Sequence, residues 1–563
     1  MLIKERVEKW ITHVNVSAEM REEILSMTEE QKQDAFYTRV EFGTAGMRGL
    51  LGAGSNRMNI FTIRRANVGF AKYLLSLNRK DKQGVAIAFD NRYMSKEFAE
   101  ESARVLASFG IESYVYSTLR PTPQLSFTVR EKNCLGGIVI TASHNPKEYN
   151  GYKVYDETGC QLVPEEIEKV INYVEEVDDE LSIEVKLTEQ QESLIHWLDE
   201  AMDEVYANRV LEIQLRKEQA KDIKVVFSPQ HGTAYPIVDE VLTRAGYTTV
   251  LVDEQCSPDP SFPNTKSPNP EDKIAYELGI EYAKNHRAEV VISTDPDADR
   301  VGVVVLHQGE YRLLTGNQTG SILIEYIFST MQEKGLMPKN PIMFNTVVTS
   351  DLGESVAAHY GVETEKTLTG FKFIGDKIAN YEKTNEKDFV FGYEESYGYL
   401  VQPFVRDKDA VQACLIIAEA VQYYKNQDKT LVDVLEALYN TYGAYLEEQE
   451  SLTLKGVEGS KRIAEILGGL RNHPVKTLAG VDVVEWEDYF TQTKVVNGLT
   501  LPLNGFPVSD VLKMKLADGS WVAVRPSGTE PKCKFYFCIK GVNSEDAFTK
   551  YQHFSDDLKK LTQ

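Results

Sequence analysis

The sequence predicts an α/β protein built from several domains, the last of which is α+β with an antiparallel sheet. Its 563 residues exceed what one hydrophobic core supports, so we expect three or four domains. Between residues 85 and 392, short β-branched apolar runs alternate with helical stretches, which is the pattern of mainly parallel sheets. After residue 511 the strands alternate apolar and polar residues around a hairpin turn, which indicates an antiparallel sheet.

The composition is that of a globular protein, with 42% hydrophobic and 26% charged residues. The net charge of −23 argues against nucleic acid or an anionic membrane as partner, so any phosphate site must be a local basic focus. The six cysteines show no metal-type pairing, which fits a reducing cytoplasm. The charged N-terminus does not resemble a signal peptide, and no stretch reaches transmembrane length. We therefore expect a cytoplasmic protein.

The first domain begins with a helical extension and continues as a βαβ pattern. Residues 1–35 carry apolar residues at helical spacing, namely Val7, Trp10, Ile11 and Val14, which predicts helices packed on the first domain. Strands are predicted at 85–90, 112–117 and 136–141. Between the first two we expect a helix from Ser95, as its cap, to Ser108, ended by Gly110. Residues 164–220 are helix-rich and acidic, and we assign them no chemistry.

Ser143 occupies a tight loop at the end of a predicted strand. The run 136–140 is apolar, and Asn145-Pro146 forces a turn soon after it. Open α/β sheets place ligands at such strand ends. A lone Thr-Ala-Ser-His would more often be a polar turn with a satisfied serine.

A second α/β pattern ends in three closely spaced carboxylates. Strands are predicted at 223–228, 248–252 and 289–294, with an irregular loop at 256–270 that contains five prolines. The last strand runs into Asp295, Asp297 and Asp299, whose mutual repulsion favours a bound cation. Oxygen ligands without cysteine or histidine favour Mg²⁺ over zinc. An EF-hand is excluded, because Arg300 stands where glycine is required and Leu306 where glutamate is required.

The remaining chain supplies two further polar loops. A helix at 317–334 and strands at 341–346 and 388–392 precede the loop 393–398, whose glutamates and serine suit sugar hydroxyls. In the last domain, strands at 511–516, 521–524 and 534–539 flank the loop 525–532. That loop offers a guanidinium, two hydroxyls, an ammonium and flexible amides, which are the parts of a phosphate cradle. No Gly-x-x-x-x-Gly-Lys-Ser/Thr motif occurs, so a P-loop kinase is not supported.

Five stretches together resemble the α-D-phosphohexomutases, the phosphoglucomutase/phosphomannomutase family, and most closely its long-chain, glucose-directed branch. They are Phe42-Gly-Thr-Ala-Gly-Met-Arg-Gly49, Thr141-Ala-Ser-His-Asn-Pro146 followed by Asn150-Gly-Tyr-Lys153, Asp295-Pro-Asp-Ala-Asp-Arg300, Tyr393-Glu-Glu-Ser-Tyr-Gly398, and Arg525-Pro-Ser-Gly-Thr-Glu-Pro-Lys532. Tyr393 stands where many members have glycine. The resemblance implies four domains in a heart-shaped arrangement, at 1–207, 208–309, 310–445 and 446–563. Three would be mixed α/β domains, and the fourth a smaller α+β domain.

The resemblance also implies the site residues. Catalysis would involve Ser143, Lys153, Arg48 and His144; Mg²⁺ would be bound by Ser143, as phosphoserine, with Asp295, Asp297 and Asp299; and the substrate would contact Thr44, Arg300, Thr369, Gly370, Lys372, Glu394, Ser396, Lys408, Arg525, Ser527, Gly528, Thr529 and Lys532. Lys153 would be the general acid/base, and we expect neighbouring cations to lower the pKa of its ammonium towards neutrality.

The implied reaction is the interconversion of glucose 1-phosphate and glucose 6-phosphate, with a phosphoserine enzyme and glucose 1,6-bisphosphate as the intermediate. The alternatives with the same mechanism are a phosphomannomutase and a phosphopentomutase. A metal-dependent phosphatase would not need the second phosphate site at 525–532, and a non-catalytic sensor would be expected to lose the serine or an aspartate. We expect sugar phosphates as partners and a monomer or weak homo-oligomer.

Overall fold

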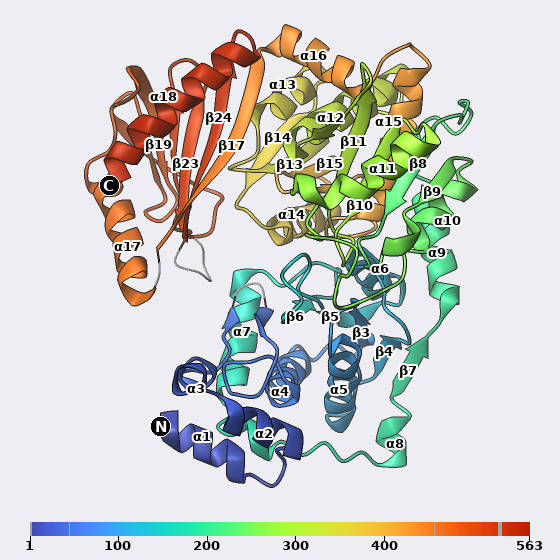
Figure 1. The fold of residues 1–563 in the computed structure, drawn as a ribbon, viewed down its shortest axis with the longest axis vertical. Coiled ribbons are helices and arrows are strands. Elements are labelled where there is room, and N and C mark those ends of the chain that lie inside the picture. Colours follow the sequence, from blue (N-terminus) through green and yellow to red (C-terminus); the bar gives the residue numbers. More distant parts are fainter. Residues whose placement is uncertain (1–2, 44–45, 455, 527–531, 563) are drawn as a thin grey trace. The chain divides into compact units, whose positions relative to one another are not determined.

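The computed structural model describes residues 3–43, 46–454, 456–526 and 532–562 (Figure 1). The chain forms two compact units, of which one comprises Met1–Gly316 and Phe371–Asp428 and the other Asn317–Gly370 and Lys429–Gln563. Within the described residues, no helix combines the length and the apolar character that crossing a membrane requires.

The first unit opens with three helices, α1 (Ile3–Thr12), α2 (Ala18–Ser26) and α3 (Glu29–Phe36), which gather beside α4 and α7 in Figure 1. Trp10 is buried and lies edge-on to Phe36 and to Phe61 of α4, with ring centroids 5.8 and 5.4 Å apart. The predicted packing of this extension on the first domain is therefore confirmed. The prediction was wrong for Val14, which lies beyond the end of α1 and is 85% exposed.

The first sheet has the order β1-β2-β6-β5-β3-β4-β7. Strands β5, β3, β4 and β7 are parallel, and β1, β2 and β6 extend the sheet in antiparallel pairs. The elements are β1 (Phe42–Gly43), β2 (Gly46–Leu50), α4 (Ile60–Ser76), β3 (Gln83–Phe89), α5 (Ser95–Ser108), β4 (Ser113–Tyr116), α6 (Thr122–Glu131), β5 (Cys134–Ile140), β6 (Tyr149–Tyr155), α7 (Pro164–Glu175), α8 (Glu189–Glu192), β7 (Ile195–Leu198) and α9 (Glu200–Leu211).

Two details of this domain differ from the sequence-based expectation. Ser95 does not cap α5: the cap is Met94, with a positive φ of 65°, and the Ser95 hydroxyl instead donates to Oδ1 of Asp90 at 2.7 Å. The acidic segment 164–220 also contains a strand, β7, which extends the parallel sheet beside β4. Four residues with mixed exposure carry too little periodicity to predict such a strand.

The second sheet has the order β12-β11-β10-β8-β9, with β10, β8 and β9 parallel and β10, β11 and β12 antiparallel. Its elements are β8 (Lys224–Ser228), α10 (Ile237–Arg244), β9 (Thr248–Leu251), α11 (Glu277–His286), β10 (Val290–Thr294), β11 (Val301–His307) and β12 (Glu310–Leu314). A third α/β segment contributes α14 (Phe371–Thr384), the antiparallel pair β15 (Asp388–Glu394) and β16 (Gly398–Leu400), and α15 (Ala410–Lys425) to the first unit.

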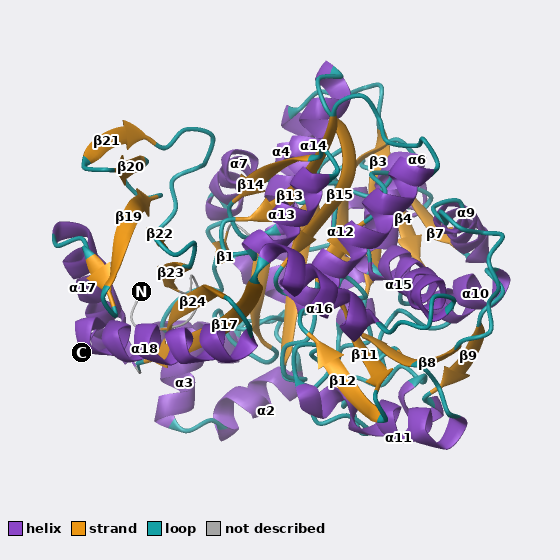
Figure 2. Ribbon diagram, turned by 90° about the horizontal axis from the view of Figure 1, so that it is seen from above, coloured by secondary structure: helices purple, strands orange, loops and turns teal. Residues whose placement is uncertain are grey.

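The second unit contains the rest of the third α/β segment and the C-terminal domain. The former supplies α12 (Gly316–Glu333) and the parallel strands β13 (Pro341–Thr346) and β14 (Glu363–Thr367) with α13 (Asp351–His359). The C-terminal strands are antiparallel in the order β17-β24-β23-β22-β19-β20-β21, and α18 lies along β24 and β17 (Figure 2). Their bounds are α16 (Leu431–Tyr442), β17 (Ala444–Thr453), α17 (Gly456–Asn472), β18 (Thr477–Leu478), β19 (Val481–Asp488), β20 (Thr493–Val496), β21 (Leu499–Pro502), β22 (Leu512–Leu516), β23 (Trp521–Pro526), β24 (Lys532–Gly541) and α18 (Ser544–Thr562). The predicted class, three mixed α/β sheets followed by an antiparallel α+β domain, is confirmed.

Buried strands explain why the polar loops occupy the edges of the sheets. β5 is covered on both faces, and a Cβ at Gly136 or Gly137 would come within 2.6 Å of the Tyr155 carbonyl or 2.5 Å of a Leu125 methyl group. Glycine at these positions therefore allows α6 and β6 to lie close to the strand. Polar residues can follow only where β5 ends, at Thr141.

Trp10→Ala should loosen the N-terminal helices, because it removes a buried indole and leaves a cavity, a change that typically costs about 3–5 kcal/mol. We expect a lower midpoint for the first thermal unfolding transition and faster proteolysis within residues 3–36. Val14→Ala, at an exposed position of the same segment, is the control. Equal stability of the two variants would contradict the packing described here.

Candidate active site

Ser143 lies just beyond β5, on the predicted serine loop. Its backbone is in the left-handed region, with a φ of 51°, and its N–H donates to Oγ1 of Thr141 at 2.8 Å. The side chain is buried, and its Oγ donates to Oδ2 of Asp295 at 2.5 Å. The structure thus brings the serine hydroxyl against the acidic turn, 152 residues further along the chain.

Asp295, Asp297 and Asp299 lie buried on the turn between β10 and β11, with one oxygen of each within 4.8 Å of the others. Oδ1 of Asp295 accepts the backbone N–H groups of Asp299 and Arg300 at 3.1 and 3.0 Å. Within the described part of the chain, Oδ1 of Asp297 and Oδ1 of Asp299 accept no hydrogen bond. Buried carboxylate oxygens without donors are costly, and they are the hard ligands that Mg²⁺ prefers. The turn therefore fits a divalent cation.

The charges in this turn are strongly coupled. Burial, together with the charges of Asp297 and Asp299, raises the pKa of Asp295 well above its ordinary value. Burial acts on Asp297 in the same direction, but the neighbouring Lys153 ammonium and hydrogen bonds outweigh it and hold the pKa of Asp297 far below its ordinary value. The turn thus combines one carboxyl that resists ionisation with one that is held ionised.

Two lysines approach the turn from other elements. Nζ of Lys153, on β6, lies 3.2 Å from Oδ2 of Asp297 and 3.8 Å from Oδ2 of Asp299. Nζ of Lys408 lies 3.1 Å from Oδ2 of Asp299 and 3.2 Å from Oδ1 of Asp407. The expected lowering of the Lys153 pKa was wrong. Burial does lower it, but the charges of Asp297 and Asp299 outweigh burial and raise it above its ordinary value.

Arg48, His144 and Arg300 border the same region. Arg48, on β2, donates from Nη1 to Oδ1 of Asn145 in the serine loop at 3.0 Å. Nδ1 of His144 lies 3.2 Å from Oγ of Ser143, and burial together with the charges of Arg300 and Arg48 lowers the pKa of His144 well below its usual value. The imidazole of His144 is therefore neutral near pH 7. Nη1 of Arg300 donates to Oε1 of Glu271 at 2.6 Å.

The sugar-loop residues reach the same cluster of charges. Glu394 ends β15 and is buried. Burial lowers the pKa of Arg300 and of Lys408, but nearby carboxylates, Asp299 and Glu394 among them, outweigh burial and raise both pKa values. Ser396 follows on the turn to β16 and is half-buried. Lys372, in the first turn of α14, has its pKa lowered to about 8 by burial, and its neighbour Phe371 lies beneath Nζ of Lys408, 5.7 Å from the ring centre.

Four of the other predicted substrate contacts belong to the second unit. They are Thr369, Gly370, Arg525 on β23 and Lys532 at the start of β24. Thr44, Ser527, Gly528 and Thr529 lie outside the described residues.

Sequence reasoning missed three residues at this site. Thr122, at the start of α6, donates its N–H to the carbonyl of Asp297 at 2.9 Å and its hydroxyl to Oδ2 of Asp297 at 3.0 Å. Arg92 contacts the backbone of the serine loop. Gly232 lies so near the acidic turn that a Cβ would come within 2.3 Å of Cα of Pro296. A signal existed for Arg92 alone, since it follows a strand predicted to end at the same sheet edge as Ser143.

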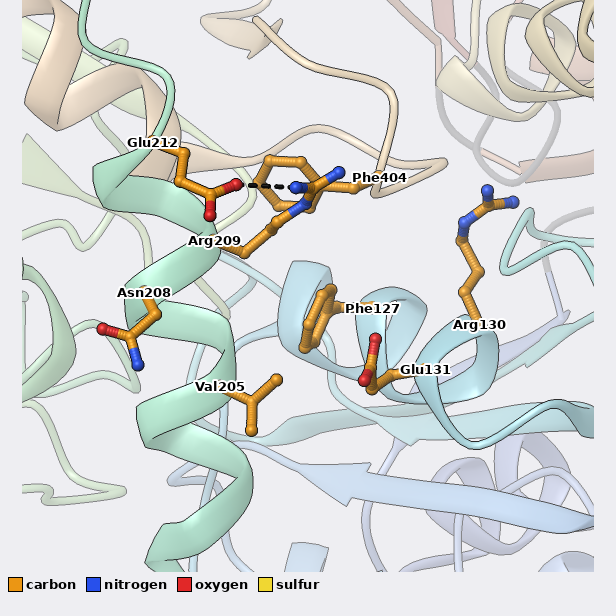
Figure 3. Close-up of a pocket in the computed structure, with 8 residues that line it drawn as sticks. All are labelled: Phe127, Arg130, Glu131, Val205, Asn208, Arg209, Glu212 and Phe404. Atoms are coloured by element: carbon orange, nitrogen blue, oxygen red, sulfur yellow. Dashed lines mark hydrogen bonds and ion pairs between the residues drawn. The ribbon is translucent and has the colours of Figure 1, made fainter.

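A separate pocket lies in the first unit between α6, α9 and Phe404 (Figure 3). The Arg209 guanidinium lies over the Phe404 ring, 5.5 Å from its centre, and donates to Glu212 at 2.6 Å. None of the residues of the acidic turn or the serine loop lines this pocket, so it is distinct from the candidate active site.

Comparison with family models matches the chain in four consecutive segments. These are the phosphoglucomutase/phosphomannomutase α/β/α domains I, II and III, at residues 39–181, 204–309 and 315–442, and the C-terminal domain of the same family at 470–554. The three mixed sheets and the antiparallel sheet correspond to these four domains.

Known proteins give the same result over nearly the full length. A phosphoglucomutase from Staphylococcus aureus is 39% identical over 524 residues, which cover 92% of this chain and 93% of that protein. A solved phosphoglucomutase/phosphomannomutase family protein from Burkholderia thailandensis shares the fold, with a TM-score of 0.67 at 17% identity over 92% of this chain and 97% of that one.

A more distant fold relative is the N-acetylphosphoglucosamine mutase of Aspergillus fumigatus, solved with GlcNAc-6P and magnesium. Its TM-score is 0.50 at 12% identity, and the match covers 100% of this chain and 99% of that one. The four matched segments and the relative at 39% identity show that the chain belongs to the phosphoglucomutase/phosphomannomutase family.

Proposed function

We propose that this chain is a phosphoglucomutase, an isomerase that interconverts glucose 1-phosphate and glucose 6-phosphate through a phosphoserine and glucose 1,6-bisphosphate. The observation that carries this proposal is the position of Oγ of Ser143, 2.5 Å from Asp295 in a buried cluster of three carboxylates. The curated relatives named phosphoglucomutase, 38–39% identical over 92–96% of the chain, support the choice within the family.

Phosphoryl transfer here needs little covalent chemistry beyond the serine. The P–Oγ bond of phosphoserine breaks, a P–O bond to a free sugar hydroxyl forms, and the proton of that hydroxyl ends on the serine oxygen. In the second half of the cycle the other phosphate of the bisphosphate returns to Ser143 by the reverse exchange. Each product leaves the enzyme phosphorylated again, so no phosphate is consumed.

We assign the metal to Asp295, Asp297 and Asp299 with the phosphoserine. Bound Mg²⁺ would neutralise charge on the phosphoryl group. The carboxylate oxygens without hydrogen bonds at Asp297 and Asp299 support this assignment. The magnesium found with the Aspergillus mutase is consistent with the same metal.

We assign Lys153 as the general acid/base, because its Nζ lies beside the acidic turn, 3.2 Å from Oδ2 of Asp297. Arg48 and Arg300 would steady the phosphoryl group, His144 would belong to the catalytic set beside Ser143, and Glu394 and Ser396 would bind sugar hydroxyls. The remaining proposed substrate contacts are Thr44, Arg300, Thr369, Gly370, Lys372, Lys408, Arg525, Ser527, Gly528, Thr529 and Lys532, of which the last five form the cradle for the non-reacting phosphate.

The wider setting follows from the same family membership. We propose domain boundaries at 1–207, 208–309, 310–445 and 446–563, supported by the order of the four matched segments. We propose a cytoplasmic protein, monomeric or weakly self-associating, whose partners are sugar phosphates, with glucose 1,6-bisphosphate also acting as activator. Neither nucleic acid nor membrane is expected as a partner at a net charge of −23.

Glucose 1-phosphate should be the preferred substrate. A pentose 1-phosphate has a shorter body with which to reach both phosphate contacts, so we expect its kcat/KM to be lower by about tenfold or more. The measurement compares kcat/KM for glucose, mannose and ribose 1-phosphates under one set of conditions. A lead for mannose or ribose would reassign the substrate and leave the phosphoserine mechanism intact.

Ser143→Ala should lower turnover by more than about a thousandfold, because it removes the atom that carries the phosphoryl group. Intact mass spectrometry after incubation with glucose 1,6-bisphosphate should show one added phosphate on the natural protein and none on the variant. Ser182→Ala, at an exposed position of the same domain, is the control. Mutase activity of the Ser143→Ala protein near the natural rate would refute the mechanism.

Asp297→Asn should raise the Mg²⁺ concentration needed for half-maximal activity by at least about tenfold and lower kcat with it. Calorimetric titration with Mg²⁺ would measure the loss of binding directly. Asp81→Asn, which changes an exposed carboxylate far from the turn in sequence, should leave both quantities unchanged. Full activity after exhaustive chelation would show that the metal assignment is wrong.

A further inference from the structure

Arg92 follows β3 at the sheet edge where the serine loop follows β5. The two strands are parallel neighbours, with Phe89 paired to Ile140, and the N–H of Asp90 continues the ladder by donating to the carbonyl of Ile140 at 3.0 Å. The side chain of Arg92 is fully buried and points into the serine loop. Arg92 therefore lies next to the loop that carries Ser143.

The guanidinium of Arg92 is committed to the backbone of the serine loop. Nη1 donates to the carbonyls of Pro146 and Tyr149 at 2.8 and 3.0 Å. Nη2 donates to the carbonyl of Ser143 at 2.6 Å and to that of Asn145. Nε lies 3.4 Å from Oδ2 of Asp90. The four N–H groups of Nη1 and Nη2 therefore donate to loop carbonyls, while the buried Nε lies against Asp90 without a hydrogen bond.

The loop that Arg92 holds is a strained one. Ser143 has a φ of 51°, a left-handed conformation that is unfavourable for a residue other than glycine and persists only where its surroundings enforce it. The carbonyl of Ser143 itself is one of the four acceptors. Without the guanidinium, the Ser143 carbonyl would lose a buried hydrogen bond and three other carbonyls would lose part-buried ones, and the loop would relax to satisfy them.

Arg92 also ties the serine loop to the domain that carries the aspartates. Its guanidinium lies 5.5 Å from the centre of the Phe262 ring, in the proline-rich loop 256–270. The adjacent Asn91 donates from Nδ2 to the carbonyl of Asp259 in that loop at 3.0 Å. The proline-rich loop, to which the sequence assigned no chemistry, thus packs against the side chain that fixes Ser143.

We propose that Arg92 is a positioning residue for Ser143: it anchors four backbone carbonyls of the serine loop and thereby keeps Oγ directed at Asp295. This inference deepens the proposed function and depends on its phosphoserine chemistry. Its effect falls on phosphoryl transfer rather than on substrate binding, because the guanidinium is fully buried and its four Nη hydrogens are taken by loop carbonyls. Lysine cannot replace it, since one ammonium has three donors and no planar fork.

The test compares Arg92→Lys and Arg92→Ala with Arg65→Lys and Arg65→Ala. Arg65, on α4, is also buried, at 4% exposure. It pairs with Glu175 on α7 and does not contact the serine loop. For both Arg92 variants we expect kcat to fall by about a hundredfold, the loss typical of a nucleophile displaced by about 1 Å. KM should change less than about threefold, and the rate of phosphate incorporation from glucose 1,6-bisphosphate, followed by intact mass, should fall with kcat.

A merely structural arginine would behave differently. Added methylguanidinium should restore part of kcat and of serine phosphorylation in Arg92→Ala and have no effect on Arg65→Ala. The proposal is overturned if Arg92→Lys keeps kcat within about threefold, or if losses follow thermal stability equally in the Arg92 and Arg65 series without rescue. Failure of the natural protein to act on glucose 1-phosphate would instead refute the proposed substrate. The rate at which glucose 1,6-bisphosphate phosphorylates Ser143 would still test the positioning role of Arg92.

Discussion

The buried cluster of three carboxylates on one turn is the constraint on which the rest of the site depends. Three acidic side chains this close together and shielded from water repel one another and lose hydration. Compensation comes from separate elements: Lys153 from β6, Lys408 from the loop before α15, and the hydroxyls of Ser143 and Thr122. Oδ1 of Asp297 and Oδ1 of Asp299 accept no hydrogen bond in the described part of the chain, and a cation bound there would offset the remaining negative charge.

This arrangement follows from the way α/β sheets end. β3, β5 and β10 are mostly apolar and buried, with Gln83, Ser293 and Thr294 as their polar residues, so most polar groups of the site lie beyond the ends of these strands. The carboxyl ends of parallel strands share one edge, which brings Arg92 and Ser143 together. α15 adds a further link to the acidic turn, because the N–H of Ala410 at its first position donates to the carbonyl of Ala298 at 3.1 Å. Backbone contacts of this kind fix the turn without adding charge.

The features predicted from sequence were those encoded locally. A serine before Asn-Pro at a strand end and three aspartates at alternate positions can be recognised from adjacent residues, and the structure brings both together. The pKa of Lys153 could not be predicted, because it depends on carboxylates about 145 residues away in sequence. Ser95 was misread as a cap because its hydroxyl is taken by Asp90, a contact that propensity does not reveal. The role of Arg92 depends on four carbonyls, which carry no side-chain signature. Residues 527–531 of the phosphate loop lie outside the described residues, so the predicted role of the loop stays a prediction.

Gly232 has a consequence for reading variation in this protein. It lies on the turn after β8, and a change from glycine to alanine adds only one methyl group. Its Cα nevertheless lies against Pro296, and the N–H of the next residue, Thr233, donates to the Pro296 carbonyl at 2.7 Å. One added methyl group would therefore press on the backbone between two of the three aspartates. Gly232→Ala would then impair the active site, although residue 232 lies on a loop and is not itself a metal or substrate ligand.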